Sequence, residues 1–409
     1  MKISLRLAEQ LGADANRHGV LAEVEKHSGV ERHTVASWLN NTARYVSLDA
    51  LGRVADYLVK HGADKDLLPG ALLGRDPEYF WDALASCRNL HFCLGTRISP
   101  QWPGSDYVMS SDAHLQGRML TEISNRVYRA NGAIAVAEAG GHEQGLAHSL
   151  FPEFNLLAGP DRRLTAENAS EQWDQSKQAA IKLYESFRAQ PSSALIGLAS
   201  VKVNPLVEVM FAKAFSAKPF VSQDDVAKPG ERRCPILFRF RERKDERWAR
   251  DPQPPSCCGG LRLAAKTPAP RYGIYYETKT GRWEACDWEP ASDDVAFLFY
   301  AYRPGSVQVE VACGGFSARA TRCLTRKLDE ITEQLGTPQF ISESQHVGLY
   351  LIAFRFDPKD KNYTRDRDDR EFEFRVIPLD EKVLRGRLER KRAARKRSTA
   401  RMKTSLRKR

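Results

Sequence analysis

The stretch from Val20 to Leu58 constrains this chain more than any other, because its spacing specifies a succession of short helices. Leu21 and Val24 lie on one face of a first helix. Gly29 follows, and glycine readily supplies the left-handed corner that a turn between two helices needs. Apolar side chains then return at helical spacing at Val30, Val35, Trp38 and Leu39.

The starts of the next two helices are also marked. Glu31 stands where Ser or Thr often caps a helix, and its carboxylate suits the positive N-terminal end. Ser47 is the expected N-cap of a further helix. That helix places apolar side chains at steps of three and four at Leu48, Leu51, Val54, Ala55 and Leu58. Residues 1–13 are predicted to form another helix that packs beneath this motif.

The segments GVERHTVASWL (Gly29–Leu39) and SLDALGRVADYL (Ser47–Leu58) resemble the XRE (Cro and phage-repressor-like) helix-turn-helix family. The resemblance covers roughly residues 3–62, about a seventh of the chain. One residue departs from the family pattern: Glu25 stands where a small Ala usually packs against the turn. A Glu at this position must bend outward, or the first helix must be rotated slightly.

The resemblance implies that the second helix of the motif enters the major groove of DNA with its N-terminal side chains facing base edges. Arg is the commonest reader of guanine, and a good base contact is worth about 1–3 kcal/mol of discrimination. The alternative is a compact helical domain that binds protein. The resemblance assigns base contacts to Arg32, His33, Thr34 and Ser37, and positions nearer the phosphates to Asn40, Asn41 and Arg44.

The net charge of +11 is concentrated at one end of the chain. Residues 385–409 hold 13 Lys or Arg against one Glu, which leaves about −1 for residues 1–384. Residues 1–69 are balanced, with nine basic and nine acidic side chains. The tail has too few apolar residues to bury a face, so we expect it to be disordered or loosely helical. It is either a solvated arm or a non-specific contact to nucleic-acid phosphates.

The 409 residues suffice for two or three domains, and an apolar fraction of 42% favours globular structure. We expect a cytoplasmic protein that does not bind a membrane, because there is no long apolar run and no apolar signal core. An aromatic cluster around Tyr79, Phe80 and Trp81 is predicted to dock a linker helix on a neighbouring domain or a dimer mate. Residues 64–76 are predicted to connect the domains with a short helix.

Between the linker and the tail, apolar runs of strand length alternate with helical patterns, which predicts an α/β region with a largely parallel, Rossmann-like sheet. Residues 251–260 and 359–370 are predicted to be surface loops, and the region is either one domain or two divided near 226–233. The predicted strands are 90–95, 194–199, 236–240, 273–276, 296–300, 307–313, 347–356 and 371–377, and the predicted helices are 111–127, 173–187, 206–215 and 321–335.

Two junctions between a strand and a helix are candidate sites for a small anionic or nucleotide ligand, because helix N-termini bind anions and ligands favour the C-terminal ends of strands. Neither junction matches GxGxxG or the P-loop pattern, and glycine at such a turn also serves geometry alone. The candidate ligand-binding residues are Ser200, Asn204 and Glu208 at the first junction and Gly314, Gly315 and Ser317 at the second.

The sequence assigns no catalytic residue, metal ion or cofactor. Its eight cysteines form no CxxC pair and are most simply free and buried, with a Cys257–Cys258 vicinal disulfide as the alternative. Cys313 is either a nucleophile or a packed residue at a strand end. His142 and His148, with Glu143, lack the HExxH spacing.

Together these features predict an α plus α/β multidomain protein. Its parts are an all-α helix-turn-helix domain (1–66), a linker helix (67–87), an α/β region (88–384) and a disordered basic tail (385–409). The corresponding function is a homodimeric regulator of transcription that binds double-stranded DNA and senses a ligand. Two alternatives remain: a nucleotide- or nucleoside-processing enzyme with a helix-turn-helix targeting module, and a component of a multi-protein assembly such as phage defence whose tail binds RNA.

Overall fold

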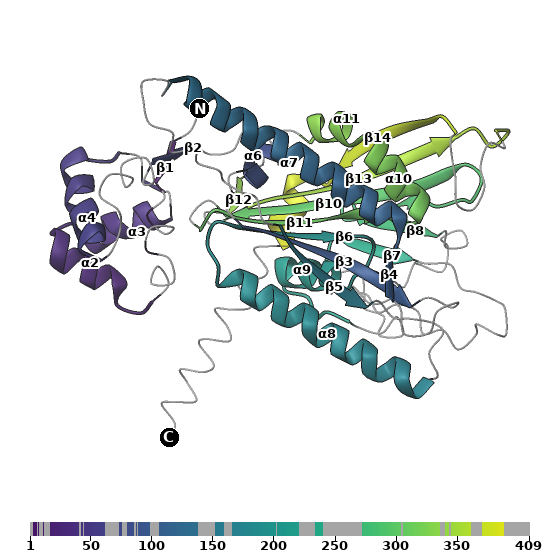
Figure 1. Ribbon diagram of the computed structural model, residues 1–409, viewed down its shortest axis with the longest axis horizontal. Coiled ribbons are helices and arrows are strands. Elements are labelled where there is room, and N and C mark those ends of the chain that lie inside the picture. Colours follow the sequence, from purple (N-terminus) through teal and green to yellow (C-terminus); the bar gives the residue numbers. More distant parts are fainter. Residues whose placement is uncertain are drawn as a thin grey trace.

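The structure is a computed structural model, and within the residues that it describes the chain is a mixed α/β protein (Figure 1). No helix in that part has the length and apolar composition that crossing a bilayer requires. The described residues are 3–5, 7, 11, 17–40, 42–43, 45–61, 73–75, 80–85, 87, 89–98, 106–137, 152–158, 166–201, 203–220, 234–239, 272–303, 306–335, 340–342, 345–360 and 370–387.

The N-terminal residues form a unit with its own hydrophobic cluster, which runs from Leu5 to Leu58. Its helices are α2 (Val20–Ser28), α3 (Arg32–Leu39) and α4 (Leu48–Lys60). The prediction of one helix over residues 1–13 is wrong at its start, because β1 (Ile3–Leu5) pairs antiparallel with β2 (Leu73–Arg75). β2 also falls within the connector predicted over 64–76, and the rest of that connector lies outside the described residues. This pairing joins segments about 70 residues apart, which local periodicity does not report.

A central mixed sheet forms the body of the molecule. β3 pairs in parallel with β5 and β6, β6 pairs in parallel with β11, and the remaining described pairs are antiparallel. The predicted parallel arrangement therefore holds around β3 and β6 only. The strands are β3 (Asn89–Ile98), β4 (Asp106–Val108), β5 (Pro152–Ala158), β6 (Ser193–Leu198), β10 (Asp293–Arg303), β11 (Gln308–Gly315), β12 (Phe340–Ser342), β13 (Gln345–Phe356) and β14 (Phe372–Pro378).

The direction of each strand follows from its connection. α7 (Ser110–Ala137) and α8 (Ala166–Arg188) lie between β3, β5 and β6 in the chain, and parallel neighbours need such crossovers. β10 and β11 are separated by only 304–307, which suffices for a hairpin and forces an antiparallel pair.

Both faces of the sheet are covered (Figure 1). One face packs against α6 (Phe80–Ala85), α7, α10 (Ala318–Arg326) and α11 (Leu328–Glu333). The other face packs against α8, α9 (Pro205–Phe215) and a second, antiparallel sheet of β7 (Ile236–Arg239), β8 (Gly273–Glu277) and β9 (Trp283–Asp287).

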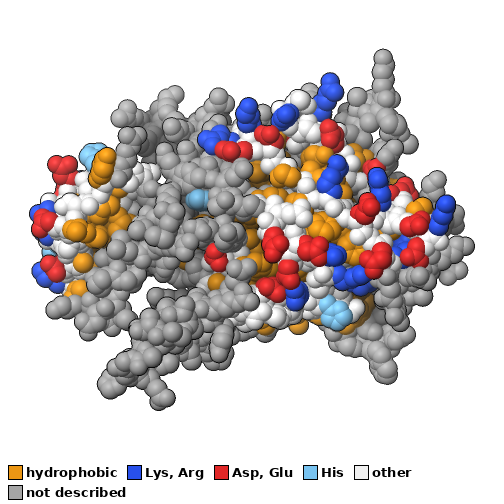
Figure 2. Space-filling model, turned by 90° about the horizontal axis from the view of Figure 1, so that it is seen from above, with side chains coloured by type: hydrophobic (Ala, Val, Ile, Leu, Met, Phe, Trp, Pro, Cys, Tyr) orange, Lys and Arg blue, Asp and Glu red, His pale blue; other side chains and the backbone are white. Residues whose placement is uncertain are grey.

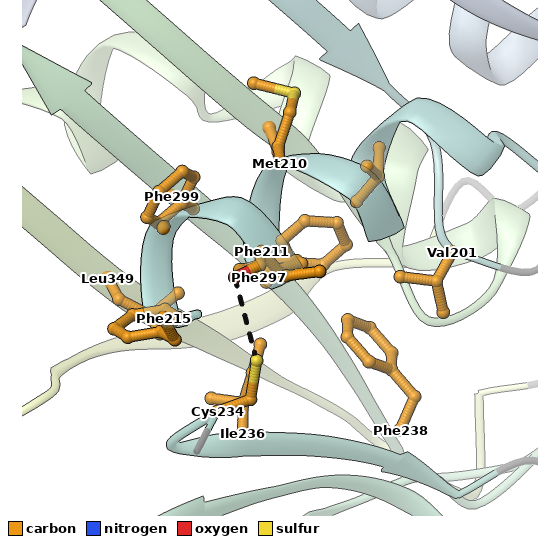
Figure 3. Packing of buried hydrophobic residues seen from close by; sticks show 14 of the residues in the cluster. Val201, Met210, Phe211, Phe215, Cys234, Ile236, Phe238, Phe297, Phe299 and Leu349 are labelled. Carbon is orange, nitrogen blue, oxygen red and sulfur yellow. Dashed lines mark hydrogen bonds between the residues drawn. The ribbon is translucent and has the colours of Figure 1, made fainter. Parts of the chain in front are cut away.

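α9 is buried on nearly all sides, and only Lys213 among its residues is exposed. Figure 3 shows Phe211 and Phe215 packed against Phe297 and Phe299 of β10. A helix that is apolar all round belongs to a core, so α9 is a central structural element between the two sheets.

Three predicted boundaries change. The predicted helix 321–335 is two helices, α10 and α11, with Lys327 between them outside both. The predicted linker helix 67–87 is helical in the described residues only over α6, where Trp81 Nε1 donates to Thr332 Oγ1 at 2.9 Å and docks the segment on the α/β body. Loops 226–233 and 251–260 lie outside the described residues, as does most of 359–370.

The basic tail begins later than predicted. Residues 381–387 form a helix, so 385–387 are wrong as part of a disordered tail. Arg387 is 4% exposed and donates to Glu277 of β8 from both Nε (2.7 Å) and Nη2 (2.5 Å). This buried pair fixes the end of the helix to the second sheet, and residues 388–409 lie outside the described part of the chain.

Candidate functional site

The turn between α2 and α3 has the geometry that its sequence predicts. Gly29 is left-handed at φ +66°, and its N–H donates to the Glu25 carbonyl at 2.8 Å. Val24 and Val35 are fully buried between the helices, and Trp38 is 1% exposed. These contacts hold α3 against α2 by one side, so its other side is left to solvent.

The candidate base-contacting side chains differ in their surroundings. Arg32 and His33 in the first turn of α3 are exposed, and Thr34 and Ser37 are half-buried. Ser37 Oγ donates to the Thr34 carbonyl at 2.7 Å. Asn40 is exposed, and its Nδ2 donates to the Ala36 carbonyl at 2.9 Å. Asn41 and Arg44 lie outside the described residues, so the surface that the structure describes centres on the first turn of α3.

The N-terminus of α3 is capped by a residue that the sequence did not indicate. Glu31 occupies the N-cap position, but its side chain makes no capping hydrogen bond. Instead, the Arg32 N–H donates to Glu25 Oε1 at 3.3 Å, and Arg32 Nε donates to Glu25 Oε2. These hydrogen bonds lower the pKa of Glu25. Glu31 therefore holds the predicted N-cap position, but the carboxylate that hydrogen-bonds to the start of α3 is that of Glu25.

Two large apolar side chains beside α3 are exposed to solvent. Tyr45 is 91% exposed and Leu48, the first residue of α4, is 81% exposed. Ser47 between them caps α4 as predicted, accepting from Ala50 N at 3.4 Å. The segment between α3 and α4 thus leaves two large apolar side chains exposed on the N-terminal unit.

The structure brings the two predicted ligand junctions together at the C-terminal ends of the neighbouring strands β6 and β11. Leu198 and Cys313 are register partners on β6 and β11, and Ala199 N donates to the Cys313 carbonyl at 3.1 Å. Gly314 lies directly against Ala199, because a Cβ on Gly314 would come within 2.7 Å of its backbone carbon. Ala199 itself is left-handed at φ +91°. The two junctions therefore meet through backbone packing at this point.

Asn204 is fully buried and hydrogen-bonded to three segments. Its Nδ2 donates to the carbonyls of Cys93 and Leu198, each at 2.9 Å. Its Oδ1 accepts from Leu206 N at 3.0 Å and so caps α9. The side chain thereby ties β3, β6 and α9 together.

The other residues of the first junction are also buried. Glu208 is 1% exposed, and its Oε1 accepts from Phe220 N at 3.0 Å. Ser200 is 6% exposed, and its carbonyl accepts from Val203 N at 2.9 Å and from Asn204 N at 3.0 Å, which closes the turn into α9.

At the second junction Ser317 caps α10 and accepts from Arg319 N at 3.1 Å. Its hydroxyl donates to Asp294 Oδ2, which also accepts from Arg319 Nε at 3.0 Å. Burial raises the pKa of Asp294, and the Arg319 guanidinium opposes that shift. Gly315 N donates to Thr321 Oγ1 at 2.9 Å. The Ser317 hydroxyl, which was expected to bind a ligand, therefore binds this chain.

No protein-family model, curated protein or solved structure matches this chain. Its function is therefore inferred from its own residues.

The predicted free, buried cysteines are confirmed at the six positions that the structure describes: Cys87, Cys93, Cys234, Cys286, Cys313 and Cys323. Cys257 and Cys258 lie outside the described residues, as do His142, Glu143 and His148. Burial raises the pKa of the Cys313 thiol to about 12, which keeps it protonated at neutral pH and makes it a poor nucleophile. Among the described residues no group of three His, Cys, Asp or Glu side chains is arranged to hold a metal ion.

Sequence reasoning missed two functional or structural partners, Glu25 and Asp294. Glu25 departs from the XRE pattern that the sequence resembles, and it lies seven residues before Arg32 across a tight turn. That spacing of opposite charges could have indicated the ion pair. Asp294 pairs with Arg319 across 25 residues, and nothing in the local sequence of either residue indicates the contact.

Proposed function

We propose that this protein is a sequence-specific regulator that binds double-stranded DNA through α3. The observation that carries the proposal is the exposure of Arg32 and His33 on the first turn of a helix held from behind by buried Val35 and Trp38. In a helix-turn-helix motif this turn enters the major groove and its side chains meet base edges. Thr34, on the same turn, and Ser37, on the next, are the further candidates for base contact.

The proposal assigns general affinity for DNA to another part of the chain. Residues 1–69 have balanced charge, so they supply little long-range attraction to phosphates. Figure 2 shows basic and acidic side chains interspersed on the face of the body seen from above. Lys327, which lies between α10 and α11, forms an ion pair with Glu330 of α11 at 2.7 Å. Residues 388–409 hold 11 Lys or Arg and one Glu. We assign non-specific phosphate contact to this segment, because such affinity grows with the number of neutralised phosphates.

The α/β body is proposed to sense a ligand and thereby to set the geometry of a homodimer whose apolar contact lies in the N-terminal unit. One recognition helix contacts only a few base pairs, and paired half-sites are the usual way in which such motifs gain affinity. The exposed Tyr45 and Leu48 provide apolar surface for contact with a second copy. Sedimentation velocity should show a dimer that Leu48→Ser weakens. The matched control is Leu156→Ser, because Leu156 on β5 is also a large exposed apolar residue, at 60%. This variant should leave the dimer unchanged.

The division of labour between α3 and the tail is tested with two variants of the full chain. A pool of duplexes with a randomised segment is first used to select the preferred site. Arg32→Ala should cost about 1–3 kcal/mol on that site and relax the preference at one base pair. Removal of residues 388–409 should weaken binding to every duplex by a similar factor and flatten the salt dependence. Ending the chain after Arg387 keeps the buried pair with Glu277 intact.

Failure to select any sequence would contradict the proposal. So would an equal loss from both variants on the selected site and on random DNA. The enzyme alternative has no comparable support within the described residues, because Asn204 and Ser317 are hydrogen-bonded to their own chain and the Cys313 thiol is protonated.

A further inference from the structure

The carboxylate of Glu25 contacts Arg32 at two points. Oε1 accepts from the Arg32 backbone N–H at 3.3 Å, and Oε2 accepts from Nε of its guanidinium. The two residues come from different helices, α2 and α3, that pack side by side (Figure 1). The Arg32 side chain nevertheless remains 61% exposed, and that of Glu25 is 35% exposed. The pair thus restricts the guanidinium without covering it.

The pairing uses one edge of the guanidinium. An arginine carries five N–H donors in a planar fork, one on Nε and four on the two Nη atoms. With Nε bonded to Glu25, the four Nη donors are those that remain for a ligand. Two parallel N–H groups match the O6 and N7 acceptors of guanine in the major groove.

We propose that Glu25 is a positioning residue that fixes Arg32 to read guanine, so that the base pair opposite this side chain is G·C. This inference rests on the proposed function. A free arginine side chain loses rotamer freedom when it binds, and an arginine already held by Glu25 loses less. The fixed guanidinium is also less able to swing toward a phosphate or a different base. Glu25 therefore raises the discrimination at one base pair.

The same carboxylate has an opposite effect on non-specific binding. Glu25 carries a negative charge close to the proposed DNA surface, so it opposes the approach of phosphates. Removal of that charge should increase affinity for random duplexes while it decreases the preference for guanine. A purely structural role predicts instead that the preference for guanine falls together with thermal stability, without a gain in affinity for random duplexes, because residues 388–409 supply the phosphate contacts whether or not α3 is intact.

The test compares two isosteric substitutions in the full chain, Glu25→Gln and Glu23→Gln. Glu23 lies on the same helix, is 30% exposed and pairs with Arg17 at 2.5 Å, so it provides the same change in charge without contact to Arg32. Gln at position 25 keeps an amide oxygen that can accept from the Arg32 backbone N–H. Thermal unfolding of both variants controls for stability.

Each protein is assayed on duplexes selected from the randomised pool and on copies changed at the base pair whose preference Arg32→Ala relaxes. Both Gln variants should bind random duplexes about twofold more tightly at ~0.1 M salt. Only Glu25→Gln should lower the preference for G·C at that base pair, by about threefold to tenfold.

The outcomes separate this inference from the function on which it rests. If the wild-type chain selects no sequence, both are overturned. If it selects a site and Arg32→Ala relaxes one base pair, but Glu25→Gln discriminates as well as Glu23→Gln, only the role of Glu25 is overturned. A selected base pair other than G·C opposite Arg32 also overturns it.

Discussion

Replacing Asn204 with alanine should destabilise the α/β body by about 3–5 kcal/mol. The side chain is fully buried and satisfies the carbonyls of Cys93 and Leu198 and the N–H of Leu206. A buried polar group left without a partner costs about 1–3 kcal/mol, and loss of a helix N-cap costs about 0.5–2 kcal/mol. Two orphaned carbonyls and one lost cap together give about 2.5–8 kcal/mol, and the stated range lies in the lower half of that interval.

The assay is urea denaturation of the full chain followed by far-UV circular dichroism. Ser200→Ala is the matched control, because Ser200 lies in the same turn and its hydrogen bonds to Val203 and Asn204 run through its backbone carbonyl. We expect the control to cost less than about 1 kcal/mol. A normal denaturant slope in both variants would confirm that stability, rather than compactness of the unfolded state, has changed.

The reasoning is refuted if Asn204→Ala unfolds at the same urea concentration as Ser200→Ala. A variant of normal stability that had lost binding of a nucleotide, measured by calorimetry, would show instead that Asn204 serves a ligand. The experiment thereby decides between the structural role seen here and the ligand role that the sequence suggested.

The remaining predictions concern the end of the last helix and the buried thiols. Arg387→Ala should destabilise the protein by about 3–5 kcal/mol, because it leaves the carboxylate of Glu277 largely buried and unpaired. The control Arg385→Ala removes an exposed ion pair with Glu381 and should cost no more than about 1 kcal/mol. Equal urea midpoints for the two variants would contradict this prediction. Cys313 should resist alkylation in the native protein at pH 8, because its thiol pKa is raised to about 12 and only the thiolate reacts. Peptide mapping after iodoacetamide treatment should find Cys313 modified only after denaturation, and rapid modification of the native chain would contradict the assigned burial.

The elements that the sequence predicted well are those whose signal is local. Gly29 indicated the corner after α2 and Ser47 the start of α4, because each acts on the backbone within a few residues. The exposure of Arg32 on α3 belongs to this group, since it follows from the helical position of its buried neighbours.

Predictions failed where a distant partner decided the outcome. The strand Ile3–Leu5 exists because Leu73–Arg75 pairs with it, and helical periodicity in the first residues gave no warning. The structural role of Asn204 also depends on a partner far away in the sequence, because the Cys93 carbonyl that it satisfies lies 111 residues earlier in the chain. The Asn204 side-chain amide, which the sequence suggested for a ligand, makes its hydrogen bonds within the chain.

The turn that presents α3, the N-cap of α4 and the asymmetric placement of charge were determined by the sequence itself, because propensity, capping and charge are properties of neighbouring residues. Only the tertiary structure decided which strands are antiparallel, that the two predicted ligand junctions meet through Gly314 and Ala199, and that Glu25 bonds to Arg32. Each of these depends on which surfaces meet when the chain packs, and a hydrogen bond or a steric contact acts only between groups that packing has brought together.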